Sequence, residues 1–209
     1  MRLQGKVAVV TGGGSGFGAG ICAKFVAEGA KVVVADLNLD GAKAVASALG
    51  AATLPLRADV SQAADVRAML DAAERHFGAL DILVNNAGVT HLPGPLEAVA
   101  EADFDRIVAV NMKAIYQAMR EAVPRMKAKA PGAHGIRVVA LNPVAGETPL
   151  LRSFMGEDTP EMRAKFLSTI PIGRFSTPED LGNAACFLVS DEASMITGVC
   201  MEVDGGRCI

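Results

Sequence analysis

Four glycines at alternate positions follow the first apolar stretch of the chain: Gly12, Gly14, Gly16 and Gly18. The residues before them, "KVAVV", have the length and composition of a buried strand, and the residues after them have helical periodicity. A glycine-rich turn between a strand and a helix exposes backbone amides at the helix N-terminus, where phosphate groups bind. We predict that this loop, with Ser15 and Phe17 inside it, binds a pyrophosphate; the alternative is a purely structural turn.

A carboxylate ends the second apolar stretch, residues 31 to 36. Asp36 lies 20 residues after Gly16, where it can accept hydrogen bonds from the adenosine ribose hydroxyls of a dinucleotide. The same charge would repel the 2′-phosphate of NADP, and neither Ser15 nor Leu37 offers a cation to hold that phosphate. We expect Asp36, with Leu37 beside it, to favour NAD over NADP; the alternative is a solvated loop acid.

Apolar runs of strand length alternate with helical patterns along the chain. The expected strands lie at residues 6 to 10, 31 to 36, 52 to 60, 81 to 88, 136 to 143 and 199 to 203. The expected helices lie near residues 16 to 28, 39 to 49, 61 to 77, 101 to 128 and 177 to 190. This alternation predicts an α/β fold, a doubly wound parallel sheet (Rossmann fold) with helices on both faces. We expect residues 1 to 209 to form a single domain.

The composition excludes several classes of protein. The 209 residues are 51% hydrophobic and 21% charged, enough to bury a core. A net charge of -3 with interspersed acids and bases gives no basic face for nucleic acid or a membrane surface, and no apolar run approaches a membrane span. We therefore expect a cytoplasmic protein. The cysteines show no metal or redox spacing, so we expect inert thiols and no metal site: Cys22, Cys186, Cys200 and Cys208.

Further motifs extend this pattern over nearly the whole chain. T11-G12-x-x-x-G16-x-G18 is followed by D59-V60, by N85-N86-A87-G88, by Asn111 in "AVNMK" and by "NPVAGETP" at 142 to 149. In order and spacing the chain resembles the short-chain dehydrogenase/reductase family. The resemblance implies that Asp59 and Val60 flank the adenine and that Asn86, Ala87 and Gly88 line the cofactor. It also implies that Pro143, Gly146 and Thr148 approach the nicotinamide; Val144 departs from the glycine usual after this proline.

The family's proton-transfer groups are incomplete in this sequence. The resemblance implies hydride transfer between NAD and a secondary alcohol or ketone, with a serine, a tyrosine, a lysine four residues later and an asparagine. Asn111 matches the asparagine. Tyr116 is the chain's only tyrosine, but Arg120 stands four residues later, and no serine occurs from Gln62 to Arg152. Tyr116 lies five positions after Asn111 on the same predicted helix, about 140° around its axis, so we expect a packing residue at the helix surface there.

These absences meet at one junction, "RMKAKAPGAHGIRVVALNP", where the sequence passes from helix to strand between Lys129 and Gly135. The chain is about 40 residues shorter than typical family members, the size of one strand with its crossover helix. We interpret residues 130 to 135 as the position of an excision. Either the biological chain has a segment that this sequence omits, which we favour, or the gene product lacks it. In the second case, the strand at 136 to 142 could pair beside that at 81 to 84 in a smaller sheet.

Two functions are therefore weighed, an NAD-dependent oxidoreductase and a dinucleotide-binding relic without catalysis. Residues 149 to 175 resemble the family's substrate lid, and Leu151, Phe154 and Met155 would offer it an apolar wall; the alternative is a surface helix packed on the sheet. His91 could lie near the mouth of the pocket or simply be solvated. The resemblance implies a homotetramer.

Overall fold

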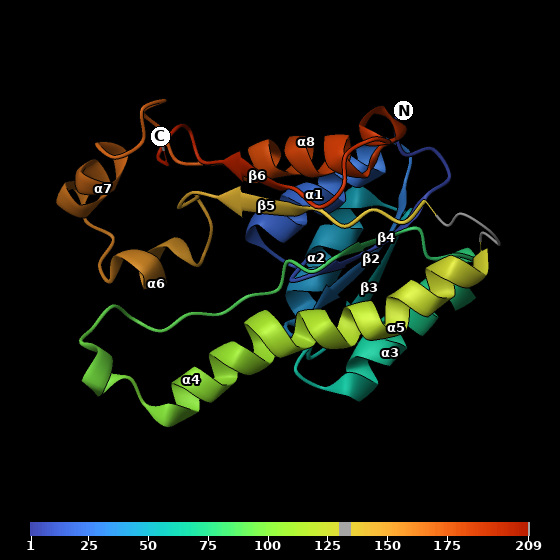
Figure 1. Cartoon of the computed structure of the whole chain (residues 1–209), viewed down its shortest axis with the longest axis horizontal. Helices are drawn as coiled ribbons and strands as arrows, with labels where there is room; N and C mark the ends of the chain where they lie inside the picture. The colour runs from blue at the N-terminus through green and yellow to red at the C-terminus, as the bar shows by residue number, and fades with distance from the viewer. Residues whose placement is uncertain (130–134, 209) are drawn as a thin grey trace.

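The computed structural model describes residues 1–129 and 135–208, and it arranges them as parallel strands between two layers of helices (Figure 1). The strands are β1 (Val7–Thr11), β2 (Lys31–Asp36), β3 (Thr53–Arg57), β4 (Ile82–Val84), β5 (Ala140–Pro143) and β6 (Cys200–Val203). The α-helices are α1 (Gly16–Ala27), α2 (Leu39–Leu49), α3 (Ala63–Phe77), α4 (Glu101–Val108), α5 (Ala114–Lys129), α6 (Leu151–Met155), α7 (Pro160–Leu167) and α8 (Pro178–Val189). Three short helical segments are η1 (Leu96–Ala98), η2 (Ala109–Lys113) and η3 (Asp191–Ala193).

The main sheet has the strand order β3-β2-β1-β4, and all its pairs are parallel. Successive side chains of a strand point to opposite faces, and both faces are apolar here. On β1, Ala8 and Val10 pack in a cluster with residues of α1, α2 and α8, whereas Val7 and Val9 pack with residues of α3 and α5. This two-sided core explains the continuous apolar runs and confirms the predicted α/β fold.

The sheet is divided into two pieces. Strands β5 and β6 form a separate parallel pair, and neither has a ladder with β4. The prediction that the strand at 136 to 142 could pair beside β4 is therefore wrong for this structure. Leu141 packs against the same core cluster as Ile82 of β4. Strand β5 is nevertheless paired with β6 and not with β4. Arg137 donates hydrogen bonds to Ser190 O (3.0 Å) and Ile196 O (3.2 Å), which anchors the start of this segment to the end of α8.

Helices α1 and α8 touch at the level of the backbone. A Cβ atom on Gly20 would lie 2.1 Å from Pro178 O, and one on Gly182 would lie 2.7 Å from Gly20 O. Only glycine permits such an approach, so this contact fixes where α1 lies on the sheet. It thereby fixes the glycine loop that precedes α1.

Helices α4 and α5 continue one another through a π-helical turn, η2, which contains Asn111. The C-terminal end of α5 is pinned by charge: Arg125 contacts Asp71 and Glu74 of α3, each at 2.7 Å, and Lys129 pairs with Asp81. Alanines at positions 114, 118 and 122 face the core from α5. The helix therefore stays in place on the main sheet up to Lys129.

The segment after β5 folds on a core of its own. Leu151 and Met155 are buried with Val144, Ile170 and Phe175, whereas Phe154 is 50% exposed. The expectation that the first two would line an apolar substrate wall is therefore wrong, because they hold α6 against its own loop. In the part of the chain that the structure describes, no helix is both long and apolar enough to cross a membrane.

Candidate functional site

The glycine loop between β1 and α1 is closed by Asn86, which follows β4. Asn86 Nδ2 donates hydrogen bonds to Thr11 O (2.9 Å) and Gly12 O (3.2 Å). A Cβ atom on Gly18 would lie 2.1 Å from Gly12 O and 2.6 Å from Asn86 Nδ2. The turn is thus compressed until only glycine fits. Asn86, expected to line the cofactor, turns its side chain to the loop and holds it.

The N-terminus of α1 is left without a side-chain cap. Ser15 stands at the N-cap position but accepts no hydrogen bond there, and the first turn contains no acidic residue. By contrast, α8 begins with a complete capping box formed by Thr177 and Asp180. Uncapped amides and the helix dipole at α1 favour an anion, so a dinucleotide's phosphates would suit this end.

The carboxylate of Asp36 lies directly beside this loop. Its Oδ2 accepts from Gly14 N at 2.9 Å, and its Oδ1 accepts from Asn38 N at 2.8 Å. A side chain at Gly14 would meet Asp36 Cγ at 3.0 Å, so the glycine leaves the space beside the carboxylate open. Each oxygen of a carboxylate has two lone pairs, so Asp36 can still accept hydrogen bonds from ribose hydroxyls. Leu37, next to it, is 60% exposed.

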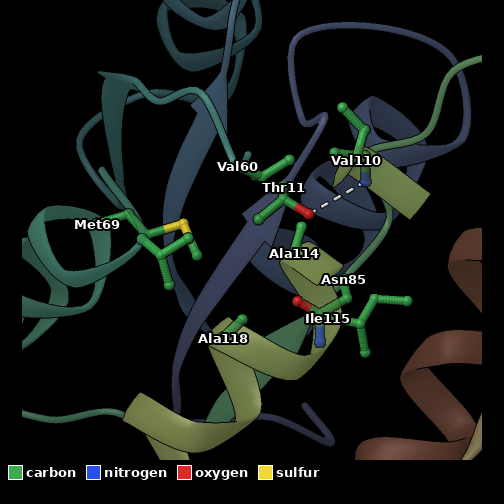
Figure 2. Close-up of a pocket in the computed structure, with 10 residues that line it drawn as sticks. Thr11, Val60, Met69, Asn85, Val110, Ala114, Ile115 and Ala118 are labelled. Carbon is green, nitrogen blue, oxygen red and sulfur yellow. Dashed lines mark hydrogen bonds between the residues drawn. The ribbon is translucent and has the colours of Figure 1, made fainter. Parts of the chain in front are cut away.

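Thr11 ties the carboxyl ends of β1 and β4 together. Its Oγ1 accepts from Asn86 N (3.0 Å) and Ala87 N (3.1 Å) and donates to Val84 O (3.2 Å). The dashed line at the labelled Thr11 in Figure 2 marks the hydrogen bond from Ala87 N. The residue is 1% exposed, so the junction is buried. The sequence reasoning did not give Thr11 a role of its own, although its position before the first glycine was the available signal.

A narrow pocket lies at the carboxyl ends of β1, β3 and β4 (Figure 2). Val60 and Asn85 line it from the loops after β3 and β4, and Val110 and Ile115 line it from η2 and α5. Its open space of about 10 Å³ suits no more than a water molecule. Asp59, expected to flank the adenine, accepts from Ser61 Oγ at 2.7 Å.

Asn111 clamps the loop that follows β4. Its Oδ1 accepts from Val89 N at 2.9 Å, and its Nδ2 donates to Val89 O at 2.8 Å. The side-chain amide is therefore engaged at both ends with the backbone of one residue. In this structure Asn111 is a positioning residue that fixes the course of the loop after Gly88.

The loop after β5 meets the glycine loop through Phe17. A Cβ atom on Gly146 would lie 2.1 Å from Phe17 Cζ, and one on Gly16 would lie 3.1 Å from Thr148 Cβ. Pro143 is exposed and Val144 is buried in the neighbouring cluster. The structure therefore places Gly146 and Thr148 against the glycine loop, whereas the sequence predicted a place near the nicotinamide for them.

Among the residues that the structure describes, the groups for proton transfer are not assembled. Tyr116 lies at the surface of α5, as expected, but it is 62% exposed and therefore contributes less packing than expected. The residues 130–134 of the proposed junction lie outside the described residues. Among residues 1–129 and 135–208, no group of three or more His, Cys, Asp or Glu side chains could hold a metal ion. Cys22 and Cys186 are buried, whereas Cys200 and Cys208 are exposed.

Comparison with known proteins identifies the class. A family model described as "short chain dehydrogenase" matches residues 6–154, and one described as "Enoyl-(Acyl carrier protein) reductase" matches residues 125–207. The chain therefore belongs to the short-chain dehydrogenase/reductase family, whose members are oxidoreductases.

Individual relatives cover the whole chain. It is 42% identical, over an alignment of 252 residues, to the 4-formylbenzenesulfonate dehydrogenase of Comamonas testosteroni, with 100% of both chains covered. It is 35% identical to the D-threitol dehydrogenase of Mycolicibacterium smegmatis, covering 100% of this chain and 95% of that one. The crystal structure of a 3-ketoacyl-(acyl-carrier-protein) reductase from Brucella melitensis complexed with NADH superposes with a TM-score of 0.92 at 44% identity, covering 99% and 100% of the two chains.

Proposed function

We propose that this chain binds NAD in preference to NADP and belongs to a dehydrogenase that interconverts a secondary alcohol and a ketone. The observation that carries the proposal is the Asp36 carboxylate, 2.9 Å from Gly14 N, beside the uncapped N-terminus of α1. The carboxylate favours ribose hydroxyls over a 2′-phosphate, and the helix end favours the pyrophosphate. The neighbouring structure that contains NADH supports the nicotinamide cofactor.

The residues of the site fall into four groups by the part of NAD that each would hold. The loop from Gly12 to Gly18 would bind the pyrophosphate, and Asp36 with Leu37 would bind the adenosine ribose. Asp59 and Val60 would flank the adenine. The nicotinamide end would lie near five residues from two loops: Ala87, Gly88, Pro143, Gly146 and Thr148. When bound, NAD accepts or supplies the hydride, and Asn111 keeps the loop after β4 in place beside it through Val89.

We also propose that a segment is missing between Lys129 and Gly135. The alignment with the Comamonas dehydrogenase spans 252 residues, whereas this chain has 209, so at least 43 aligned positions have no residue of this chain. The unpaired edges of β4 and β5 among the described strands are consistent with one absent strand. The serine, tyrosine and lysine required for proton transfer would lie in that segment.

The second candidate is a dinucleotide-binding protein without catalysis. It is favoured by the exposed Tyr116 and by the absence of serine from residues 62 to 152, if the protein has only these 209 residues. The two candidates share the cofactor site and differ only in turnover.

Two measurements test these proposals. Fluorescence titration should show NADH binding at least about tenfold tighter than NADPH, a difference of about 1.4 kcal/mol; equal or reversed affinities would reject the NAD assignment.

Intact-mass spectrometry of the protein from its native source addresses the missing segment. A mass about 4 to 5 kDa above 21.5 kDa would support an omitted strand and helix, whereas a mass of 21.5 kDa would reject it.

The cellular setting is a proposal of its own. We propose a cytoplasmic homotetramer acting on a small molecule, without nucleic-acid or membrane partners. Apolar side chains on the exposed side of the α4–α5 helix support self-association: Phe104 is 61% exposed and Met112 is 67% exposed. Light scattering after gel filtration would give the mass of the assembly; a monomer at micromolar concentration would contradict the proposal.

A further inference from the structure

A hollow of about 380 Å³ lies between the loop after β4 and helix α4. The loop after β4 and helix α4 form most of its wall, and Ser153 of α6 completes it. Thr90, at its rim, directly follows Val89, which Asn111 clamps. This volume accommodates a small organic molecule. Thr90 stands two residues after Gly88 of the proposed cofactor site, so the hollow adjoins that site along the chain.

The polar atoms of the hollow are mainly hydrogen-bond acceptors. His91 Nδ1 lies 2.7 Å from Leu92 O, and a carbonyl only accepts, so the neutral ring carries its hydrogen on Nδ1 and leaves Nε2 as an acceptor. Thr90 Oγ1 donates its hydrogen to His91 O at 3.2 Å, so the hydroxyl can only accept a hydrogen bond from a ligand. Asp103 adds a carboxylate. A ligand that brings hydrogen-bond donors matches this set.

The one cation in the wall is already compensated. Arg106 Nη2 donates to Asp103 Oδ1 at 3.0 Å and to Thr90 O at 3.2 Å, which uses both of its hydrogens. An anionic ligand would therefore meet the remaining edge of Arg106 together with the negative charge of Asp103. The hollow as a whole has one charge of each sign, so it offers no net attraction to a sulfonate or carboxylate.

We propose that this hollow binds the hydroxyl-bearing part of a neutral diol or polyol substrate and discriminates against anionic substrates. Hydroxyl groups donate to His91 Nε2, Thr90 Oγ1 and the Asp103 carboxylate and accept from the Ser153 hydroxyl. Asp103 sets the discrimination, because it cancels the charge of Arg106. This inference rests on the proposed function, since the hollow adjoins the site where the substrate would react.

The test is a titration of the isotope-labelled protein followed by amide chemical shifts, with butane-1,2,4-triol as the neutral probe and 2-hydroxyethanesulfonate as the anion. The triol should saturate shifts at Thr90, His91 and Ser153, and the sulfonate should bind several times more weakly. Replacing Asp103 by Asn (Asp103→Asn) should strengthen binding of the sulfonate by about three- to fivefold, because the usual energy of an exposed ion pair corresponds to a factor of that size in affinity. Asp105→Asn removes a neighbouring charge that lies outside the hollow's wall and should leave both affinities unchanged.

Tighter binding of the sulfonate than of the triol by the unchanged protein would overturn the inference. So would an equal gain of sulfonate binding in the Asp103→Asn and Asp105→Asn variants, which would reveal a general charge effect. Both readouts are independent of turnover. NADH binding, measured on the same samples, tests the proposed function separately, because Asp36 is not part of the hollow.

Discussion

The side-chain amide of Asn111 makes two hydrogen bonds with the backbone of Val89, at 2.9 and 2.8 Å. This pairing joins the π turn of the long helix to the loop that follows β4. Because one residue satisfies both the N–H and the C=O of Val89, the loop cannot shift without breaking both bonds. The clamp explains how an amide that does not titrate can still determine the geometry of the site.

Asn111→Ala should lower the free energy of unfolding by about 1–3 kcal/mol, because it leaves half-buried backbone groups unpaired. Asn111→Asp should also destabilise, since a carboxylate cannot donate to Val89 O. Urea unfolding measures both effects. Asn142→Ala is the control: its amide reaches only Glu202, at 3.5 Å on an exposed strand, and its stability should change little. Equal losses in the two alanine variants would contradict the clamp.

Asp36→Ala should reduce the preference for NADH over NADPH, chiefly by removing repulsion of the 2′-phosphate. The variant also loses the hydrogen bonds to Gly14 N and Asn38 N, so NADH should bind less tightly as well. Fluorescence titration with both cofactors measures the ratio. Asp40→Asn, an exposed acid in the first turn of α2, controls for net charge and should keep the ratio. An unchanged ratio in Asp36→Ala would remove this residue from cofactor selection.

Gly18→Ala should destabilise the fold by roughly 1–3 kcal/mol and weaken NADH binding, because its Cβ atom would lie 2.1 Å from Gly12 O. The loop must open to admit it, and the amides at the start of α1 move with the loop. Gly94→Ala is the matched control, since nothing lies within 4 Å of its added Cβ atom. Thermal unfolding and NADH titration of both variants would show whether the compressed turn matters; similar behaviour would argue against it.

The capping box of α8 predicts a stability change in acid. A hydrogen bond from the Arg174 guanidinium is the main cause that holds the pKa of Asp180 well below its usual range, and hydrogen bonds from Thr177 lower it further. A lowered folded pKa means that the stabilisation is complete above the unfolded value of about 3.9 and is lost as the pH falls below it. Asp180→Asn should therefore cost about 1 kcal/mol at pH 7 and less at pH 2.5, where part of the stabilisation has been lost. Urea unfolding at both pH values tests this, with the exposed Glu179→Gln as control; a pH-independent difference would be the contrary result.

Much of the fold could be predicted from the sequence because the signals are local. The helix at 39 to 49 and the strand at 31 to 36 have the predicted ends, since apolar periodicity and the Asn38 cap determine them. The glycine loop after β1 was recognisable because its backbone leaves no room for a side chain, as at Gly18, so glycine must stand there. The division of the sheet was not predictable, because pairing of β5 with β6 rather than β4 depends on contacts distant in sequence, such as those of Arg137.

The site shows the same limit. The types and spacing of Asp36 and Asn111 indicated where they would lie, but not their hydrogen-bond partners. The engagement of Asn111 with Val89 depends on the π turn, and nothing in "AVNMK" distinguishes a π turn from an ordinary helical turn. Leu151 and Met155 belong to a small core and not to the predicted substrate wall. The sequence could not separate the two, because apolar residues that line a pocket and apolar residues that fill a core have the same local pattern.

The central proposal is that recognition of the pyrophosphate and the adenosine depends on residues before the junction, whereas turnover depends on proton-transfer groups in the missing segment. The direct measurement is the oxidation or reduction rate for a panel of secondary alcohols and ketones by the exact 209-residue protein, with NADH affinity determined on the same sample. The comparison is the same protein with the unmatched segment of the Comamonas dehydrogenase inserted between Lys129 and Gly135. We predict that the 209-residue protein binds NADH without turnover above background, and that the insertion raises the rate by at least about 10²-fold. Turnover by the 209-residue protein that is abolished by Tyr116→Phe would contradict the claim and make Tyr116 the acid.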